Sequence, residues 1–295
     1  MFKFFNKIKK LYSIISLQLG RKVVIGNNIY RTKGIYLNRI TLNDDHEPWL
    51  DLIYNAALAA KHGAFIDVGA NSGQTLMKIL SLDKNIEYVG FEPQLDCCYY
   101  IDQFIRKNSL SSHLILPVGL SNTSKVVLLF KRTDDMDTTA STVDGFRPTD
   151  FYSSKQAIYV TSGDKIISDI NLSAISTIKI DVEGGELEVI DGLKNTFSEY
   201  KPFVIFEVLN NFLVVTDSEL DKDTIKFRMN RIEKMENILR DAGYKLFNIL
   251  PDDGLVEVSK IEPCVSNDLR ITDYIAIHKD YRSNFFDKYK GMLQS

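Results

Sequence analysis

Short apolar and β-branched runs alternate with helical patterns along most of this chain, and this alternation limits the possible folds more than any other feature. The strand-like runs cover residues 64–68, 86–91, 113–118, 175–180, 203–208, 244–250 and 274–278. Helical patterns stand between most of them, at residues 74–82, 95–107, 186–197 and 226–242. The sequence therefore predicts an α/β fold in which a mainly parallel sheet is covered by helices on both faces.

The alternation is interrupted between residues 119 and 174. Two further strand-like runs, 125–130 and 157–161, are separated here by a polar stretch without a strong period. A chain of 295 residues with 44% apolar residues can bury a sizeable core as one unit. We expect one domain over residues 44–295, in which 119–174 is an insertion between the third and fourth strands that acts as a lid.

The N-terminal segment, residues 1–43, has a charge balance of its own. It contains nine Lys and Arg and no acid, whereas the remaining residues carry 27 Lys and Arg against 39 Asp and Glu. Apolar residues recur here at helical spacing, at Phe2, Phe5, Ile8, Tyr12, Ile15 and Leu19. Two interpretations stay open: the predicted helix packs on its own domain or a second subunit, giving a homodimer, or it lies on an anionic membrane surface. No nucleic-acid partner is expected.

Cysteine content indicates the compartment. The three cysteines, Cys97, Cys98 and Cys264, form neither a disulfide framework nor a metal-binding pair. A reducing compartment is the natural place for such a chain. We therefore expect a cytoplasmic protein, which the N-terminal helix could attach to the inner face of the membrane.

The first strand-to-helix turn, "AFIDVGANSGQT", is rich in small residues. Gly69, Ser72 and Gly73 would let the backbone approach a ligand beyond the carboxyl end of the strand, where such folds bind their ligands. Asp67 at the end of the strand could receive a donor or a cation. The spacing departs from the G-x-G-x-x-G of dinucleotide sites. A nicotinamide-dependent oxidoreductase is therefore an alternative that the turn disfavours.

An acid ends the second strand. In "EYVGFEP", Glu92 follows Gly73 by 19 positions, about where an acid reaches a ribose diol in such folds. The glycine turn and this distant acid together predict a nucleoside ligand with a small acidic or zwitterionic tail.

More acids end the next strands. In "TIKIDVEGGELEVIDGL", Asp181 and Glu183 follow a buried run, and Glu207 ends "PFVIFEVL". Carboxylates at these strand ends would meet over one crevice. The pair Asp181 and Glu183 can act there as a general base, as hydrogen-bond acceptors or as ligands of a hard metal. Glu186, in the first turn of a helix, has a structural explanation in the helix dipole.

Six stretches carry a family resemblance: "FIDVGANSGQT", "GFEP", "LPVGLSN", "STVDGF", "IKIDVEGGELEVIDG" and "VIFEVL". In this order and at these intervals, they resemble the FkbM-type family of S-adenosylmethionine-dependent methyltransferases. The resemblance implies a Rossmann-like class I methyltransferase fold with a seven-stranded sheet, parallel except for one strand. It also implies methylation of a hydroxyl of a sugar, glycan, glycolipid or secondary metabolite.

The same resemblance assigns the cosubstrate site. It places Asp67, Gly69, Asn71, Ser72 and Gly73 around the methionine end of S-adenosylmethionine. It places Glu92 on the ribose and Gly119, after the third strand, at the adenine position. Many relatives of this fold have an acid or amide at the adenine position, where this chain reads Val118, Gly119, Leu120 and Ser121.

Methyl transfer to an alcohol benefits from a positioned base. Asp181 is the first candidate for this base and Glu183 the second. Two carboxylates do not complete the octahedral shell of Mg²⁺ and the sequence indicates no third ligand, so no metal site is assigned. Thr138, Thr139, Ser141 and Thr142 in the insertion are expected to form the acceptor wall. A non-catalytic module that only binds S-adenosylmethionine is the remaining alternative.

Overall fold

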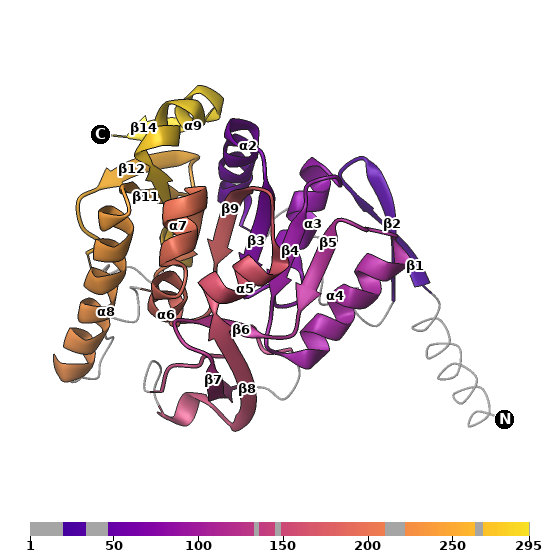
Figure 1. Ribbon diagram of the computed structural model, residues 1–295, viewed down its shortest axis with the longest axis horizontal. Helices are drawn as coiled ribbons and strands as arrows, with labels where there is room; N and C mark the ends of the chain where they lie inside the picture. Colours follow the sequence, from indigo (N-terminus) through magenta and orange to yellow (C-terminus); the bar gives the residue numbers. More distant parts are fainter. Residues whose placement is uncertain are drawn as a thin grey trace.

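The computed structural model describes residues 20–33, 47–132, 136–144, 149–209, 222–262 and 268–294. Most of them belong to one nine-stranded sheet, in the spatial order β14-β12-β11-β13-β10-β9-β3-β4-β5 (Figure 1). Its strands are β3 (Ala64–Val68), β4 (Tyr88–Phe91), β5 (His113–Leu116), β9 (Ile175–Ile180), β10 (Phe203–Glu207), β11 (Tyr244–Leu250), β12 (Gly254–Val258), β13 (Asp273–His278) and β14 (Met292–Gln294). The expected α/β class is confirmed.

The sheet is mixed and larger than expected. Strands β5, β4, β3, β9 and β10 are parallel, β13 is antiparallel to both of its neighbours, and β11 returns to the first direction. These are the seven strands that the sequence predicts. The short strands β12 and β14 add two more at one edge, antiparallel to β11, so the seven-stranded prediction is wrong in number.

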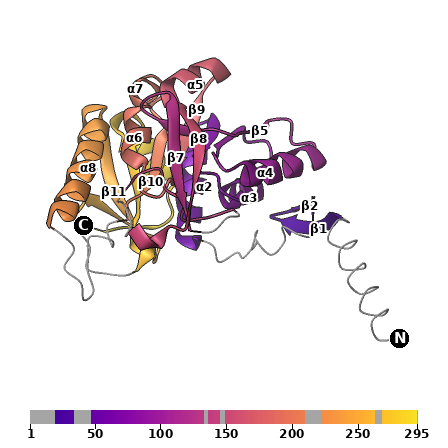
Figure 2. The ribbon, with the colours of Figure 1, turned by 90° about the horizontal axis from the view of Figure 1, so that it is seen from below.

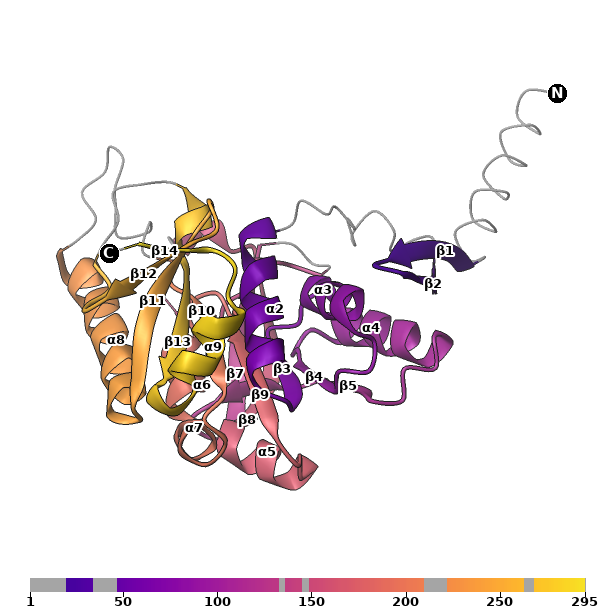
Figure 3. The same cartoon turned by 90° about the horizontal axis from the view of Figure 1, so that it is seen from above.

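Helices cover both faces of this sheet (Figures 2 and 3). One face carries α2 (Asp51–Ala60), α3 (Gln74–Leu82), α4 (Leu95–Lys107) and α9 (Arg282–Lys288). The other carries α5 (Gly163–Ile170), α6 (Glu186–Asp191), α7 (Lys194–Tyr200) and α8 (Lys222–Asp241). Neighbouring residues of the central strand β3 serve opposite faces, since Phe65 packs into the first layer and Ile66 into the second. No helix in the described ranges is long and apolar enough to cross a membrane.

Helices α6 and α7 replace the single helix expected over residues 186–197. The break falls at Gly192, which follows the end of α6. A Cβ atom on Gly192 would lie 1.9 Å from the backbone oxygen of Ser121, so the chain passes too close to the insertion for any side chain. The close approach of two backbones therefore requires glycine at the break between the two helices.

A separate three-stranded sheet precedes α5. It contains β6 (Gly119–Ser121), β8 (Ser154–Ser162) and β7 (Lys125–Lys131), in that spatial order. Figure 1 shows it beyond the lower edge of the main sheet. Helix α5 also falls within the range 119–174. It packs on the main sheet, because its Ile167 is buried in the second helical layer.

Two more strands, β1 (Gly20–Ile25) and β2 (Asn28–Lys33), form an antiparallel hairpin beside α3 and α4. The sequence did not indicate this hairpin. Short 3₁₀ helices occur at Pro48–Leu50, Thr149–Phe151, Leu269–Ile271 and Lys279–Tyr281. The amphipathic helix expected between residues 2 and 19 lies outside the described residues.

Candidate active site

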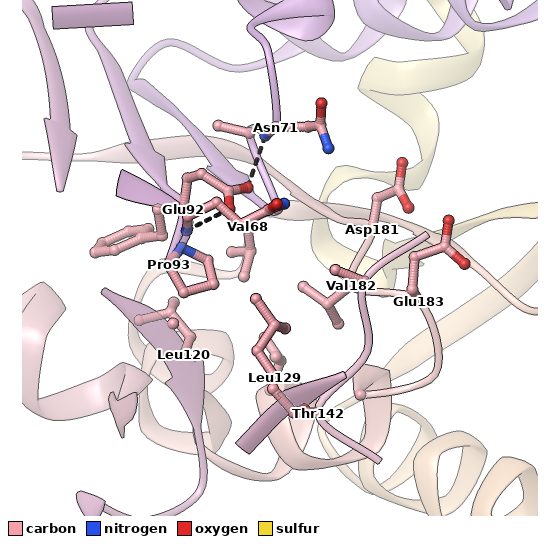
Figure 4. Close-up of a pocket in the computed structure, with 18 of the residues that line it drawn as sticks. Val68, Asn71, Glu92, Pro93, Leu120, Leu129, Thr142, Asp181, Val182 and Glu183 are labelled. Atoms are coloured by element: carbon pink, nitrogen blue, oxygen red, sulfur yellow. Dashed lines mark hydrogen bonds between the residues drawn. The ribbon is translucent and has the colours of Figure 1, made fainter. Parts of the chain in front are cut away.

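A cavity of about 640 Å³ lies where the carboxyl ends of the parallel strands face the small sheet. Figure 4 shows Glu92 on one side of this cavity and Asp181 and Glu183 on the other. Six of the nine predicted site residues line it: Gly69, Asn71, Glu92, Gly119, Asp181 and Glu183. The volume is in the range of cavities that enclose small-molecule ligands.

The turn after β3 is shaped by its small residues. Gly69 has φ +91°, and a Cβ atom there would lie 1.8 Å from the backbone oxygen of Asp181. Only glycine fits this close approach. Asn71 also has a positive φ, 43°, and its side-chain oxygen accepts a hydrogen bond from Ser72 N at 2.7 Å. At Gly69 the turn therefore presents backbone rather than a side chain to the cavity.

Glu92 holds the turn from the neighbouring strand. Its Oε2 accepts a hydrogen bond from Asn71 N and its Oε1 accepts one from Gln94 N, each at 2.8 Å. The side chain is almost fully buried. Burial raises the pKa of Glu92 to about 7, although the two hydrogen bonds lower it. Each carboxylate oxygen keeps further acceptor capacity for a ligand hydroxyl.

Gln94 connects this loop to the insertion. Its Nε2 donates to the backbone oxygen of Asp137 at 2.8 Å, and its Oε1 accepts from the backbone N–H of Asp137 at 2.9 Å. Asn71 Nδ2 donates to the same backbone oxygen at 3.2 Å. The Asp137 carboxylate in turn accepts from both N and Oγ1 of Thr139 at 2.8 Å. One wall of the cavity is thus fixed by side chains from two strand ends.

The opposite side of the cavity is acidic. One carboxylate oxygen from each of Asp181, Glu183 and Glu207 lies within 4.8 Å of the others. Glu183 takes a positive φ of 55° in the turn after β9, and Glu207 ends β10. Glu207 Oε1 accepts a hydrogen bond from Thr272 Oγ1 at 3.1 Å. Burial and the charges of Asp181 and Glu183 raise the pKa of Glu207 well above its usual range.

A buried cation orients the first of these acids. Lys179 lies on β9 and Asp181 directly follows the end of this strand, two residues later, so both side chains point to the same side. Its Nζ lies 2.8 Å from Asp181 Oδ2. Burial alone would lower the pKa of Lys179, but the carboxylates around it, Asp181 first, raise it above its usual value. Lys179 is therefore charged and balances part of the acidic cluster.

Three carboxylates meet at this cluster, and Lys179 is ion-paired with one of them, Asp181. Carboxylate oxygens suit a hard divalent cation. Asp181, Glu183 and Glu207 are therefore the residues that could hold a metal. The third ligand that was not apparent in the sequence comes from the adjacent strand β10.

The remaining predicted site residues do not line the cavity. Asp67 is fully buried beneath the turn, where its Oδ2 accepts a hydrogen bond from Tyr88 Oη at 2.6 Å. Burial raises the pKa of Asp67 to about 6. Ser72 is buried next to the turn, and Gly73, with φ +90°, precedes α3. These three residues therefore support the conformation of the turn without lining the cavity.

Gly119 begins the small sheet and lies on an apolar wall of the cavity. The surrounding lining residues are Leu120, Leu129, Ile158 and Val160. A Cβ atom on Gly119 would lie 3.0 Å from Val160 Cγ1, so a larger residue would displace this wall. The wall offers apolar side chains against which a heteroaromatic base can pack.

A family model described as the methyltransferase FkbM domain matches residues 67–246, which is more than half of the chain. The chain belongs to the FkbM methyltransferase family. The match contains all nine predicted site residues, and the resemblance seen in the motifs is confirmed. No curated protein sequence matches the chain significantly.

Several solved structures are similar to this FkbM family member. The crystal structure of Methyltransferase FkbM from Methylobacillus flagellatus KT has a TM-score of 0.44 and 17% identity, and the match covers 74% of this chain and 44% of that chain. This chain thus matches less than half of that structure's length. SAH-bound PaMTH1 from Podospora anserina has a TM-score of 0.42 and 8% identity, and the match covers 92% of this chain and 95% of that chain. A putative O-methyltransferase from Klebsiella pneumoniae has a TM-score of 0.40 and 8% identity, with 81% of each chain covered.

Sequence reasoning missed three residues that build this FkbM-family site. Gln94 and Asp137 are 43 positions apart, so their pairing leaves no local pattern. Lys179 did leave a signal, because it is a single charged residue in the apolar run "STIKI" and precedes a strand-end acid by two positions. A cation in a buried strand indicates an acidic partner on the same face.

Proposed function

We propose that this protein is an S-adenosylmethionine-dependent O-methyltransferase that acts on a hydroxyl of a sugar, glycan or glycolipid. One observation carries the proposal: a single cavity has the Glu92 carboxyl at one side and the Asp181 and Glu183 carboxyls at the other. Methyl transfer needs a nucleoside site and a proton acceptor that open into one space.

The residues on the Glu92 side fit the cosubstrate. Glu92 would accept hydrogen bonds from the ribose hydroxyls, while the backbone at Gly69 allows the methionine end to approach closely. The adenine ring would lie against the apolar wall formed by Leu120 and Val160. When bound, S-adenosylmethionine supplies a methyl group on a positively charged sulfur, which the acid-rich cavity favours electrostatically.

The residues on the other side fit an alcohol acceptor. The acceptor oxygen attacks the methyl carbon in line, so that a C–O bond forms as the C–S bond breaks and S-adenosylhomocysteine leaves. Asp181 takes the hydroxyl proton, and the ion pair with Lys179 holds its carboxylate in position. Glu183 orients the acceptor. A positioned base of this kind contributes on the order of 10² to 10⁴ in rate, and alignment contributes further.

The sugar-type acceptor is inferred from the family and from polar groups in the cavity. Thr138, Thr139 and Thr142 line it together with the acids, which gives several partners for a polyhydroxylated ligand. We place the reaction in the cytoplasm. Cys97 and Cys98, both buried and free, agree with a reducing compartment.

The test uses methyl-tritiated S-adenosylmethionine and a panel of free, nucleotide-linked and lipid-linked sugars. Transfer of label to a hydroxyl, located by mass spectrometry, supports the proposal. Label found on nitrogen or carbon would show that the protein is an N- or C-methyltransferase and not an O-methyltransferase. Tight binding of a nicotinamide dinucleotide, with none of S-adenosylhomocysteine, would overturn the proposal as a whole.

A further inference from the structure

The β1–β2 hairpin has one buried face. Ile25 and Tyr30 are buried against α3 and α4, and the Tyr30 ring lies 5.7 Å from that of Phe104. At the tip, a Cβ atom on Gly26 would lie 2.5 Å from the backbone oxygen of Ser81 at the end of α3. The hairpin is thus packed closely on the domain.

Hydrogen bonds fix the orientation of the hairpin. Asn108, just after α4, accepts from Arg31 N at 2.6 Å through Oδ1 and donates to the Arg31 backbone oxygen at 2.9 Å through Nδ2. Thr32 Oγ1 and Tyr100 Oη lie 3.1 Å apart on the buried side. The outer face is therefore presented at a fixed angle to the domain.

The outer face combines an apolar pair with two cations. Val24 and Ile29 are opposite each other in the hairpin, and each is 67% exposed. The next pair along the same face is Lys22 and Arg31, both also exposed. The hairpin contains no acid. The outer face therefore combines exposed apolar side chains with positive charge, which distinguishes it from an apolar pair alone.

We propose that this outer face binds an anionic membrane surface. Val24 and Ile29 would enter the headgroup region, while Lys22 and Arg31 would pair with lipid phosphates. Charge complementarity supports this partner, because residues 1–43 carry nine cations and no acid, whereas the rest of the chain carries a net negative charge. A second copy of the same face fits poorly, since it would bring four cations together.

The position of the hairpin is compatible with activity at a membrane. In Figures 1 and 2, β1 and β2 lie at the end of the molecule opposite α8. No hairpin residue lines the cavity, so membrane contact through Val24 and Ile29 would leave the cavity free. The proposal stands on the hairpin alone and does not depend on which acceptor is methylated.

Sedimentation of the full chain with lipid vesicles tests the proposal. The protein should sediment with vesicles of phosphatidylglycerol and phosphatidylcholine, and remain in solution with phosphatidylcholine alone. The double variants Val24→Ser with Ile29→Ser and Lys22→Gln with Arg31→Gln should each lower the partition coefficient by about tenfold. Added salt should weaken the binding of the wild type.

Val126→Ser with Leu128→Ser is the matched control, because these side chains are 69% and 47% exposed on the small sheet. This variant should sediment like the wild type, and thermal unfolding checks that every variant is folded. Equal sedimentation of wild type and hairpin variants would overturn the proposal. So would absence of binding to anionic vesicles, preferential binding to DNA, or a dimer in light scattering that the Val24 and Ile29 changes dissociate.

Discussion

Gln94 and Asp137 form two hydrogen bonds, at 2.8 Å and 2.9 Å, that connect the Glu92 side of the cavity to the insertion. Both residues are buried, so leaving one of these groups without its partner is costly. The pair therefore helps to hold the segment 136–144 at the cavity, together with the backbone pairing of Ser141 and Phe130.

Replacing Gln94 by Ala should release this segment. The backbone N–H of Asp137 would lose its partner, at a cost of about 1–3 kcal/mol in the free energy of unfolding. Gln94→Glu keeps an acceptor for this N–H but loses the donor, so its effect should be intermediate. Amide hydrogen exchange within 136–144 measures both changes. Unchanged exchange in Gln94→Ala would show that other contacts hold the segment.

Gly69→Ala tests the close approach of the turn to β9. Because its Cβ atom would overlap the Asp181 backbone oxygen and its φ is +91°, we expect a loss of more than about 2 kcal/mol in stability. Gly185→Ala is the control, since Gly185 lines the same cavity with negative φ and its nearest Cβ neighbour would be 3.3 Å away. If both variants unfold at the same temperature as the wild type, this interpretation is contradicted.

Asp181→Asn should bind S-adenosylhomocysteine as the wild type does and lose most of its turnover. The amide keeps the shape of the carboxyl but does not take up the acceptor proton, so a loss of about 10²-fold or more in single-turnover rate is expected. Undiminished methylation would exclude Asp181 as the base. Activity that disappears on chelation and returns with Mg²⁺ would instead make Asp181, Glu183 and Glu207 metal ligands.

The sequence predicted the central strands and helices well because their signals are local. β3, α3, α4, β9 and β11 have the predicted bounds, since each is a contiguous apolar run or helical pattern. The short strand β14 leaves no local signal because it pairs with the distant β12, whereas β12 forms a hairpin with the preceding β11 that the sequence analysis missed. The close contact of Gly192 with the backbone at Ser121 is also nonlocal, so the sequence does not show it.

The candidate site was predicted in outline and not in detail. Strand-end acids at Glu92, Asp181 and Glu183 do line one cavity, as parallel strands require. Asp67 follows the same pattern and yet lies below the cavity, where its carboxyl accepts a hydrogen bond from Tyr88 on the adjacent strand. No sequence pattern shows which side of a turn such a carboxyl will face.

Binding of S-adenosylhomocysteine should depend on pH through Glu92. Its pKa of about 7 in the free protein means that the carboxyl is largely protonated at pH 6, whereas ribose hydroxyls donate to the ionised form. Affinity should therefore rise about tenfold from pH 6 to pH 8. Calorimetric titrations at the two pH values measure this change, and a Glu92→Gln variant should lack it. Affinity that falls with rising pH would contradict the role of Glu92.

Calorimetric titration of wild type, Glu92→Gln and Glu186→Gln with S-adenosylhomocysteine tests the cosubstrate site most directly. Glu186 is a matched control, because it is also buried, accepts backbone N–H bonds from Val182 and Gly184, has a pKa raised by burial to about 7, and does not line the cavity. We predict one binding site in the wild type, an affinity lower by about 1–3 kcal/mol in Glu92→Gln, and little change in Glu186→Gln. Equal affinity of all three proteins, or no binding by the wild type, would contradict the assignment of this cavity to S-adenosylmethionine.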